Sequence, residues 1–237
     1  MISEKDFAEK YTSFWQVAVP TSERLIREAN RLGYGRFAPP LKTASRPESH
    51  GIIAEIAFEI LRESYSPLKI KPVSPDQIAI IAKAAYENVR RLAQVSPARL
   101  PSPNSREISE AQQLAKRMEK FFFEKELAIE LVFNPRFAGC GVIDDCYGDL
   151  LANNTLYEIK TGDRPYRSVD LRQVLVYAAL NYASGTYPIT RIALLNPRLG
   201  TYLRFELDIL SDQLSGKAPA ELFGDIVHFV SSDNISL

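Results

Sequence analysis

The sequence contains little cysteine, no long apolar segment and no recognisable leader, and each absence excludes a class of protein. Its 237 residues include only 2 cysteines, Cys140 and Cys146, too few for a disulfide framework or a four-cysteine metal site. No segment of about 18 apolar residues is present, so a membrane-spanning helix is not expected. Residues 1–6 carry charges of both signs and lack the apolar core of a signal peptide. We therefore expect a cytoplasmic protein with reduced thiols and no membrane partner.

An excess of positive charge is also missing. The 29 Lys and Arg residues balance 29 Asp and Glu residues, for a formal net charge of 0. This balance excludes proteins that coat nucleic acid through a large positive surplus. It leaves open enzymes that need positive charge only near their active site.

The first half of the chain has helical periodicity, interrupted by one proline-rich loop. Ser74, Pro75 and Gln77 form the clearest helix start, because a serine N-cap precedes a proline and a glutamine follows three residues after the serine. Ser45 and Glu48 have the spacing of a capping box. Helices are expected at residues 4–31, 47–64, 75–93 and 105–125, and the loop at residues 95–104.

The second half has a different pattern. Short β-branched or alternating segments, separated by Gly, Pro and Asn, predict strands. The order of elements predicts an α/β fold with a mixed central β-sheet flanked by helices, rather than a regular βαβ array. Strands are expected at residues 128–133, 139–144, 150–152, 155–160, 190–195 and 201–207, and helices at residues 169–182 and 220–230.

Glu158 and Lys160 carry the strongest chemical signal. Side chains alternate between the two faces of a strand, so these two residues share one face. Asp144 ends an upstream apolar segment, and a hairpin that turns near residues 153–154 would bring it beside Glu158. Two carboxylates can bind Mg²⁺ or Mn²⁺, and a nearby lysine can orient or deprotonate an attacking water. A Glu-x-Lys pair is also common on exposed strands, where it contributes little. Asp145 remains an alternative to Asp144, although strand alternation places it on the opposite face.

Three motifs in a fixed order resemble the PD-(D/E)XK nuclease superfamily, and within it the RecB-like and exonuclease branch. That family typically reads Gly-x-Ile-Asp, then Asp/Glu-x-Lys-Thr-Gly, then Gln-x-x-x-Tyr. The resemblance covers about residues 128–207 and implies a restriction-endonuclease-like core. The matching motifs are Gly141-x-x-Asp144, Glu158-x-Lys160-Thr161-Gly162 and Gln173-x-x-x-Tyr177.

The resemblance also implies roles for individual residues. Asp144, Glu158 and the main-chain carbonyl of Ile159 would bind Mg²⁺ or Mn²⁺, and Lys160 would be the catalytic lysine. Gln173 would line the site. Tyr177 would contact the nucleic-acid backbone, and its position four residues later places it on the same helix face. A place in the hydrophobic core is an equally good interpretation of Tyr177.

Glu55 lies in a helix that is apolar on nearly every side. An ionised carboxylate there is costly unless it is paired. It also stands four residues after Gly51, where RecB-like members carry a histidine in a Gly-x-x-x-His pattern. We therefore expect Glu55 to be a third metal ligand or to orient a metal-bound water, with an edge position that reaches solvent as the alternative.

Three arginines flank the predicted Gln173 helix. Arg164, Arg167 and Arg172 are placed to meet phosphates beside the site, although such charges often only cover a solvated face. We expect DNA as the substrate rather than RNA. The open alternatives are an RNA nuclease and a non-enzymatic nucleic-acid-binding subunit.

The chain is expected to form a single nuclease domain over residues 1–237. The activity would be that of an exonuclease or a structure-directed endonuclease, serving DNA repair or defence. No P-loop is present, so any motor or defence subunit would be a separate partner protein. The expected parts are a helical extension (1–45 and 66–127), a catalytic core (46–65 and 128–210) and a C-terminal helix (211–237).

Overall fold

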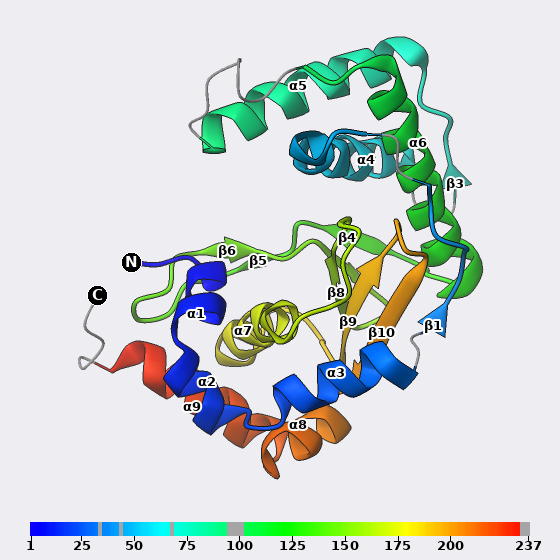
Figure 1. Cartoon of the computed structure of the whole chain (residues 1–237). Helices are drawn as coiled ribbons and strands as arrows, with labels where there is room; N and C mark the ends of the chain where they lie inside the picture. Colours follow the sequence, from blue (N-terminus) through cyan, green and yellow to red (C-terminus); the bar gives the residue numbers. More distant parts are fainter. Residues whose placement is uncertain (33–34, 43–44, 67–68, 94–101, 233–237) are drawn as a thin grey trace.

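A six-stranded mixed β-sheet forms the centre of the molecule and carries helices on both faces (Figure 1). The computed structural model describes residues 1–32, 35–42, 45–66, 69–93 and 102–232. The strand order is β1-β10-β9-β8-β7-β4. Only β8 and β9 are parallel, and the other neighbours in this sheet are antiparallel. The strands are β1 (Gly35–Arg36), β4 (Leu131–Phe133), β7 (Leu150–Ala152), β8 (Thr155–Ile159), β9 (Arg191–Asn196) and β10 (Thr201–Glu206).

Helix α7 crosses one face of this sheet because it connects the two parallel strands, which a tight turn cannot join. Its side chains pack with Leu156 of β8 and Leu194 of β9 in one hydrophobic core. Helices α1 and α9 lie against α7, and α8 lies against β10 (Figure 1). The helices of this group are α1 (Glu4–Lys10), α2 (Thr12–Ala18), α3 (Ser22–Leu32), α7 (Ser168–Ser184), α8 (Leu207–Ser215) and α9 (Pro219–Ser231).

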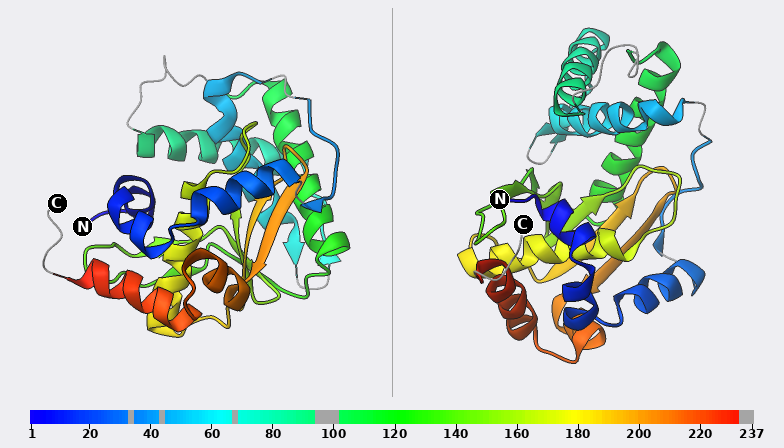
Figure 2. Two further views of the ribbon diagram at one scale, coloured as in Figure 1. Left: turned by 60° about the horizontal axis from the view of Figure 1, so that its bottom comes forward. Right: turned by 60° about the vertical axis from the view of Figure 1, so that its left-hand side comes forward.

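The opposite face carries a second hydrophobic core. Tyr157 of β8 and Leu195 of β9 pack there with Ile56 of α4 and Phe121. Figure 2 shows that α4 and α5 extend away from the sheet, while α6 runs back towards it. The elements of this face are α4 (His50–Ser64), α5 (Pro75–Ala93), α6 (Ser105–Lys120) and a π-helical turn (Phe121–Lys125).

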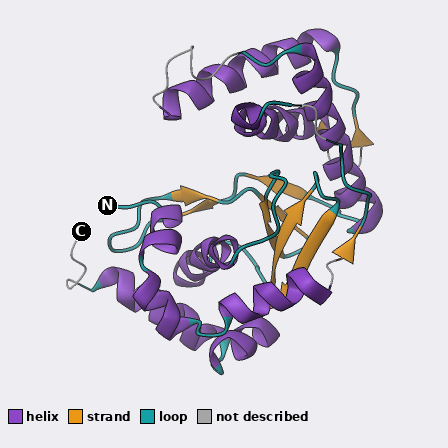
Figure 3. Cartoon of the chain, in the orientation of Figure 1, coloured by secondary structure: helices purple, strands orange, loops and turns teal. Residues whose placement is uncertain are grey.

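Two short hairpins and one 3-10 turn complete the described structure (Figure 3). One hairpin pairs β2 with β3, and the other pairs β5 with β6. The turn leads directly into α4. Their bounds are β2 (Tyr65–Ser66), β3 (Lys69–Ile70), β5 (Arg136–Phe137), β6 (Cys146–Tyr147) and the 3-10 turn Pro47–Ser49.

Local signals in the sequence explain where several helices begin and end. Ser74 caps α5 as predicted, because its hydroxyl accepts from Gln77 N–H at 3.2 Å while Ser74 N–H donates to Gln77 Oε1 at 2.9 Å. Asn104 and Glu107 form the same reciprocal pair at the start of α6. Helix α7 ends at Ser184 and is capped by Gly185, whose φ of 63° suits a residue without a side chain.

The predicted α/β class and helix-flanked mixed sheet are confirmed. The helix predicted at residues 4–31 is three shorter helices, and the capping box predicted at Ser45 is wrong, since its hydroxyl donates to Glu110 instead. Helix α8 was not predicted. The loop predicted at 95–104 lies mostly outside the described residues, and the division into extension and core stays a prediction.

Candidate active site

The β7–β8 hairpin sets the position of the site. Asn153 and Asn154 form its two-residue turn with φ values of 46° and 61°, which asparagine tolerates better than most residues. The register pairs Ala152 with Thr155 and Leu150 with Tyr157. Continuing this antiparallel register by one residue places Asp149 opposite Glu158. Both side chains then lie on the face of the sheet that α7 covers.

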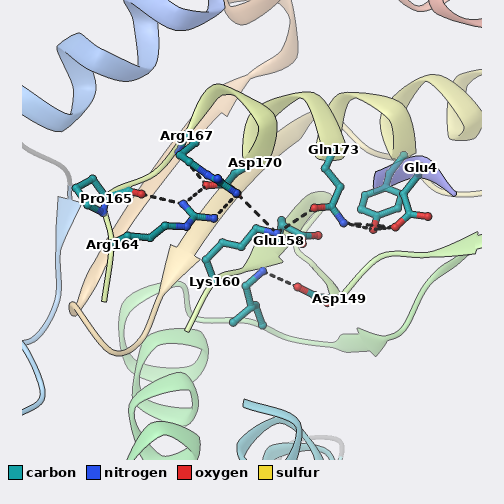
Figure 4. Close-up of polar contacts among 11 residues, drawn as sticks. Glu4, Asp149, Glu158, Lys160, Arg164, Pro165, Arg167, Asp170 and Gln173 are labelled. Carbon is teal, nitrogen blue, oxygen red and sulfur yellow. Dashed lines mark hydrogen bonds and ion pairs between the residues drawn. The ribbon is translucent and has the colours of Figure 1, made fainter. Parts of the chain in front are cut away.

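Asp149 is held in place by the backbone of the neighbouring strand (Figure 4). Its Oδ2 accepts from Ile159 N–H at 2.6 Å. Burial raises the pKa of Asp149 to about 6, although the Ile159 N–H and the Lys160 ammonium act in the opposite direction. The negative charges of Glu55 and Glu4 add to the increase. This carboxyl group is therefore harder to ionise than one exposed to water.

Glu158 is almost fully buried beside Asp149, with 4% of its surface exposed. Its Oε1 accepts from Lys160 Nζ at 2.7 Å, whereas its buried Oε2 has no hydrogen-bond partner among the described residues. Burial and the charge of Asp149 raise the pKa of Glu158 to about 8, against the opposing effect of Lys160. An orphaned carboxylate oxygen in such a place is uncommon, and a bound cation is one explanation for it.

Three acceptors surround the Lys160 ammonium (Figure 4). Glu158 Oε1 is 2.7 Å away, Gln173 Oε1 of α7 is 3.0 Å away, and Asp170 Oδ1 of α7 is 3.9 Å away. Burial alone would lower the pKa of Lys160, but the charge and hydrogen bond of Glu158 outweigh it and raise the pKa above its ordinary value. The amine is therefore held as a cation that points at the carboxylates.

Gln173 and Tyr177 continue this contact network along α7. Gln173 Nε2 donates to Tyr177 OH at 2.9 Å, and Tyr177 OH lies 3.2 Å from Glu4 Oε1. The pKa of Tyr177 is raised by burial and by the nearby carboxylates, so the phenol stays protonated. Its ring stacks on Phe137 at 5.5 Å and is 2% exposed. Tyr177 is thus a core residue with a polar end facing the site, and its ring is not accessible to nucleic acid here.

A small cavity opens at the end of β8. It has a volume of about 140 Å³ and lies between α4 and the open end of the β7–β8 hairpin, at Asp149 and Ile159. Glu55 is half-buried in its wall, and its carboxylate accepts a long hydrogen bond of 3.5 Å from Asn88 of α5. The cavity is lined by Gly51, Ala54, Glu55, Phe58, Met118, Asn134, Asp149, Ile159 and Thr161.

The predicted position of Asp144 in a strand beside Glu158 is wrong. Residues 139–144 form a turn, in which Gly141 has a φ of 56° and a Cβ would lie 1.9 Å from the Val230 carbonyl oxygen. Asp144 N–H donates to Ile2 O at 3.1 Å, and its carboxylate forms no hydrogen bond or ion pair with any described residue. Residues 139–144 anchor the N terminus, and β7 rather than this segment lies beside β8.

The alternative acidic residue, Asp145, serves a local role. It accepts from Gly139 N–H at 2.7 Å and pairs with Arg136 at 2.5 Å, on the exposed side of the same turn. Asp149 is therefore the carboxylate that faces Glu158, and the sequence interpretation missed it.

The three flanking arginines have different environments. Arg164 forms two hydrogen bonds of 2.8 Å to Asp170 and remains partly exposed. Arg172 is 7% exposed and pairs with Glu23 of α3 at 3.1 Å, so the expectation that it meets phosphate is wrong for this arrangement. Arg167 is exposed at the start of α7, and its N–H donates to Asp170 Oδ2 at 2.8 Å. Arg167 is the best placed of the three for an anionic ligand.

The donor set fits a hard divalent cation that retains much of its water. Within the described ranges, no group of three or more His, Cys, Asp or Glu side chains is close enough to chelate a metal ion by itself. Asp149, Glu158 and the Ile159 carbonyl provide two carboxylates and one neutral oxygen. Mg²⁺ typically uses one or two carboxylates and takes its remaining ligands from water and phosphate. The orphaned Glu158 Oε2 and the raised carboxyl pKa values are consistent with such an ion.

Comparisons with known proteins leave the interpretation to this geometry. No family model matches the chain, and no curated protein matches it. None of the described helices has both the length and the apolar character needed to cross a membrane.

Proposed function

We propose that this chain is a Mg²⁺- or Mn²⁺-dependent nuclease with a restriction-endonuclease-like core that hydrolyses phosphodiester bonds in DNA. The observation that carries the proposal is the position of Asp149 beside Glu158, with the Lys160 ammonium 2.7 Å from the Glu158 carboxylate. With Asp149 in place of Asp144, the order acid, Glu-x-Lys, Gln-x-x-x-Tyr is kept. The helix-flanked mixed sheet supports the same proposal.

Each residue of the site has a distinct task in this reaction. Asp149, Glu158 and the Ile159 carbonyl would hold the metal ion, and Glu55 would orient water on the far side of the 140 Å³ cavity. The bound ion would supply positive charge to the phosphate and acidify a water molecule. Lys160 would stabilise negative charge that develops in the transition state, since its ammonium is held in place before the substrate arrives. Arg167 would contact a neighbouring phosphate.

Gln173 determines where the lysine points. Its Oε1 accepts from Lys160 Nζ at 3.0 Å, while Glu158 Oε1 accepts from the same ammonium at 2.7 Å. Once a divalent ion binds Glu158, the amide would keep Lys160 within reach of the reacting phosphate. Gln173 is therefore a positioning residue rather than a metal ligand.

A cleavage assay tests the proposed function. We expect the purified protein to degrade DNA when Mg²⁺ or Mn²⁺ is added and to lose activity when EDTA removes the metal. Lys160→Ala should abolish cleavage, whereas Lys83→Ala, at an exposed lysine of α5, should leave the rate unchanged. Activity that persists in Lys160→Ala would contradict the assignment of this site.

The substrate arms of the same assay separate the remaining alternatives. Matched DNA and RNA strands, single and double, identify the preferred polymer. Faster cleavage of RNA would replace DNA in the proposal. Tight binding of DNA without cleavage and without divalent-ion binding would show instead that the chain is a nucleic-acid-binding subunit.

A further inference from the structure

Glu4 reaches the candidate site from the other end of the chain. It is the first residue of α1, yet its Oε1 lies 3.2 Å from Tyr177 OH and 3.4 Å from Gln173 Nε2. Figure 4 shows its carboxylate at the end of a row of side chains that begins at Lys160. No sequence motif connects Glu4 to the other residues of the site.

Backbone pairing fixes the N-terminal segment that carries Glu4. Ile2 N–H donates to Val142 O at 2.8 Å, and Ile2 O accepts from Asp144 N–H at 3.1 Å. Ser3 then caps α1 through a 3.1 Å bond from Asp6 N–H. The turn at residues 139–144 therefore has a structural task, because it holds the segment that places Glu4 against α7.

The side of α1 that faces the protein is also anchored by aromatic packing. Phe7 is fully buried and contacts the rings of Phe14, Trp15 and Phe229, with ring centroids 5.2–5.9 Å apart. Backbone pairing and aromatic packing act on the two sides of Glu4. Its carboxylate is thus held in place rather than free to sample solvent.

The available donors and acceptors determine which group donates in each hydrogen bond of this row of side chains. An ionised carboxylate only accepts hydrogen bonds, so Tyr177 must use its one proton to donate to Glu4. Towards Gln173 the phenol oxygen can then only accept, which requires the NH₂ end of the amide on that side. The amide oxygen must therefore face Lys160, whose ammonium only donates.

We propose that Glu4 is a positioning residue of the site: through Tyr177 and Gln173 it fixes the orientation in which an amide oxygen faces the Lys160 ammonium. Without the Glu4 carboxylate, the phenol proton is released to donate to Gln173. The amide can then rotate and present its NH₂ group to the ammonium, which repels it. Lys160 loses one of its two hydrogen bonds in that state.

The catalytic part of this inference rests on the proposed nuclease function, whereas the orientation of the amide does not. Two substitutions test it, Glu4→Gln and Tyr177→Phe, together with the double variant. Glu9→Gln is the matched control, because Glu9 is exposed on the same helix. Thermal melting and near-UV circular dichroism establish that each variant is folded.

The direct measurement is the orientation of the Gln173 amide by NMR, with its NH₂ signals assigned by their loss in Gln173→Met. In the wild type and in Glu9→Gln we expect nuclear Overhauser contacts from these protons to the Tyr177 ring. In Glu4→Gln, where the phenol proton is free to donate to the amide, we expect additional contacts to the Lys160 methylene protons. An amide that keeps the wild-type pattern in Glu4→Gln would overturn the proposal.

DNA cleavage provides the second readout. Each single substitution should lower kcat by about tenfold, as expected for the loss of one hydrogen bond at a positioned charge, and should leave KM unchanged. The double variant should lose no more than either single variant, because both act through the same row. Additive losses would also overturn the proposal. If the wild type cleaves nothing, the nuclease proposal fails, while the amide orientation still decides the role of Glu4.

Discussion

Replacing Asp149 by asparagine removes one charge from the candidate site and changes little else. Asparagine has nearly the same shape and retains an oxygen to accept the Ile159 N–H bond, which is 2.6 Å long in the native protein. Burial raises the pKa of Asp149, so its ionised form is unfavourable in the metal-free fold. The neutral side chain should therefore be tolerated, and the melting temperature at pH 8 should equal or exceed that of the native protein.

The expected effect on catalysis is large. A divalent ion contributes several kcal/mol of charge stabilisation to phosphoryl transfer, and Asp149 would be one of its two carboxylate ligands. A loss of about 3–4 kcal/mol corresponds to a rate decrease of about 10²–10³-fold. The decrease should appear at every metal concentration, because the weakened site binds the ion less tightly and places it less accurately.

Asp144→Asn is the matched control for this experiment. It makes the same chemical change five residues earlier, at a carboxylate without a hydrogen bond to any described residue. A substitution of this kind usually alters stability by less than about 0.5 kcal/mol. Its cleavage rate should stay within about threefold of the native rate, because the changed carboxylate forms no hydrogen bond or ion pair with any described residue of the site.

Single-turnover cleavage of an end-labelled duplex, with Mg²⁺ titrated from zero to saturation, measures both variants. The assignment of Asp149 would be refuted if Asp149→Asn cleaved at the native rate. It would also be refuted if the cleavage rate fell by the same factor in Asp144→Asn. Loss of activity in Asp149→Asn with a collapsed melting transition would point to misfolding. The affinity of the folded fraction for Mg²⁺ would then show whether Asp149 binds the metal ion.

Four further predictions follow from the same structure. The affinity for Mn²⁺ should rise between about pH 6 and pH 8, because Asp149 and Glu158 must release protons to bind it, and calorimetry in buffers of different ionisation enthalpy should detect those protons. Burial raises both pKa values from their ordinary values near 4, so the metal-free fold is favoured while these carboxyls are protonated. Its stability should therefore fall as pH rises from about 4 to about 8, and saturating Mn²⁺ should cancel the part of the fall in melting temperature that lies between about pH 6 and pH 8. Glu110→Ala should lower the free energy of unfolding in urea by about 3–5 kcal/mol, because it removes the carboxylate that pairs with the buried Arg198 guanidinium. Asp145→Ala, which breaks an exposed pair with Arg136, should cost less than about 1 kcal/mol in the same measurement.

Local patterns were sufficient to predict most of the sheet and the helices around it. The strands at residues 150–152, 155–160 and 190–195 were predicted from short β-branched or alternating segments between Gly, Pro and Asn, α5 from capping and α7 from periodicity. The segment 139–144 reads as a strand by the same rule, because Val142 and Ile143 are β-branched. It forms a turn since Gly141 adopts a positive φ against Val230, a contact between segments far apart in the chain.

The site could have been predicted more accurately than it was. A two-residue turn at Asn153 and Asn154 fixes the register of the hairpin, and counting back from it pairs Asp149 with Glu158. Glu-x-Lys and Gln-x-x-x-Tyr lie within single elements, and their residues contact one another across β8 and α7. Glu4 could not be found in this way, because its place depends on how the N terminus packs against α7. Asp170, the buried partner of Lys160 and Arg164, was missed because its position depends on how α7 packs on the sheet.

Crystals of the protein grown with Mn²⁺ test the central claim most directly. Anomalous scattering locates the ion without any assumption about its ligands. We expect one strong peak within coordination distance of Asp149, Glu158 and the Ile159 carbonyl, at the end of β8. A fully loaded crystal with no peak there, or with its only peak at Asp144 or Asp145, would contradict the account.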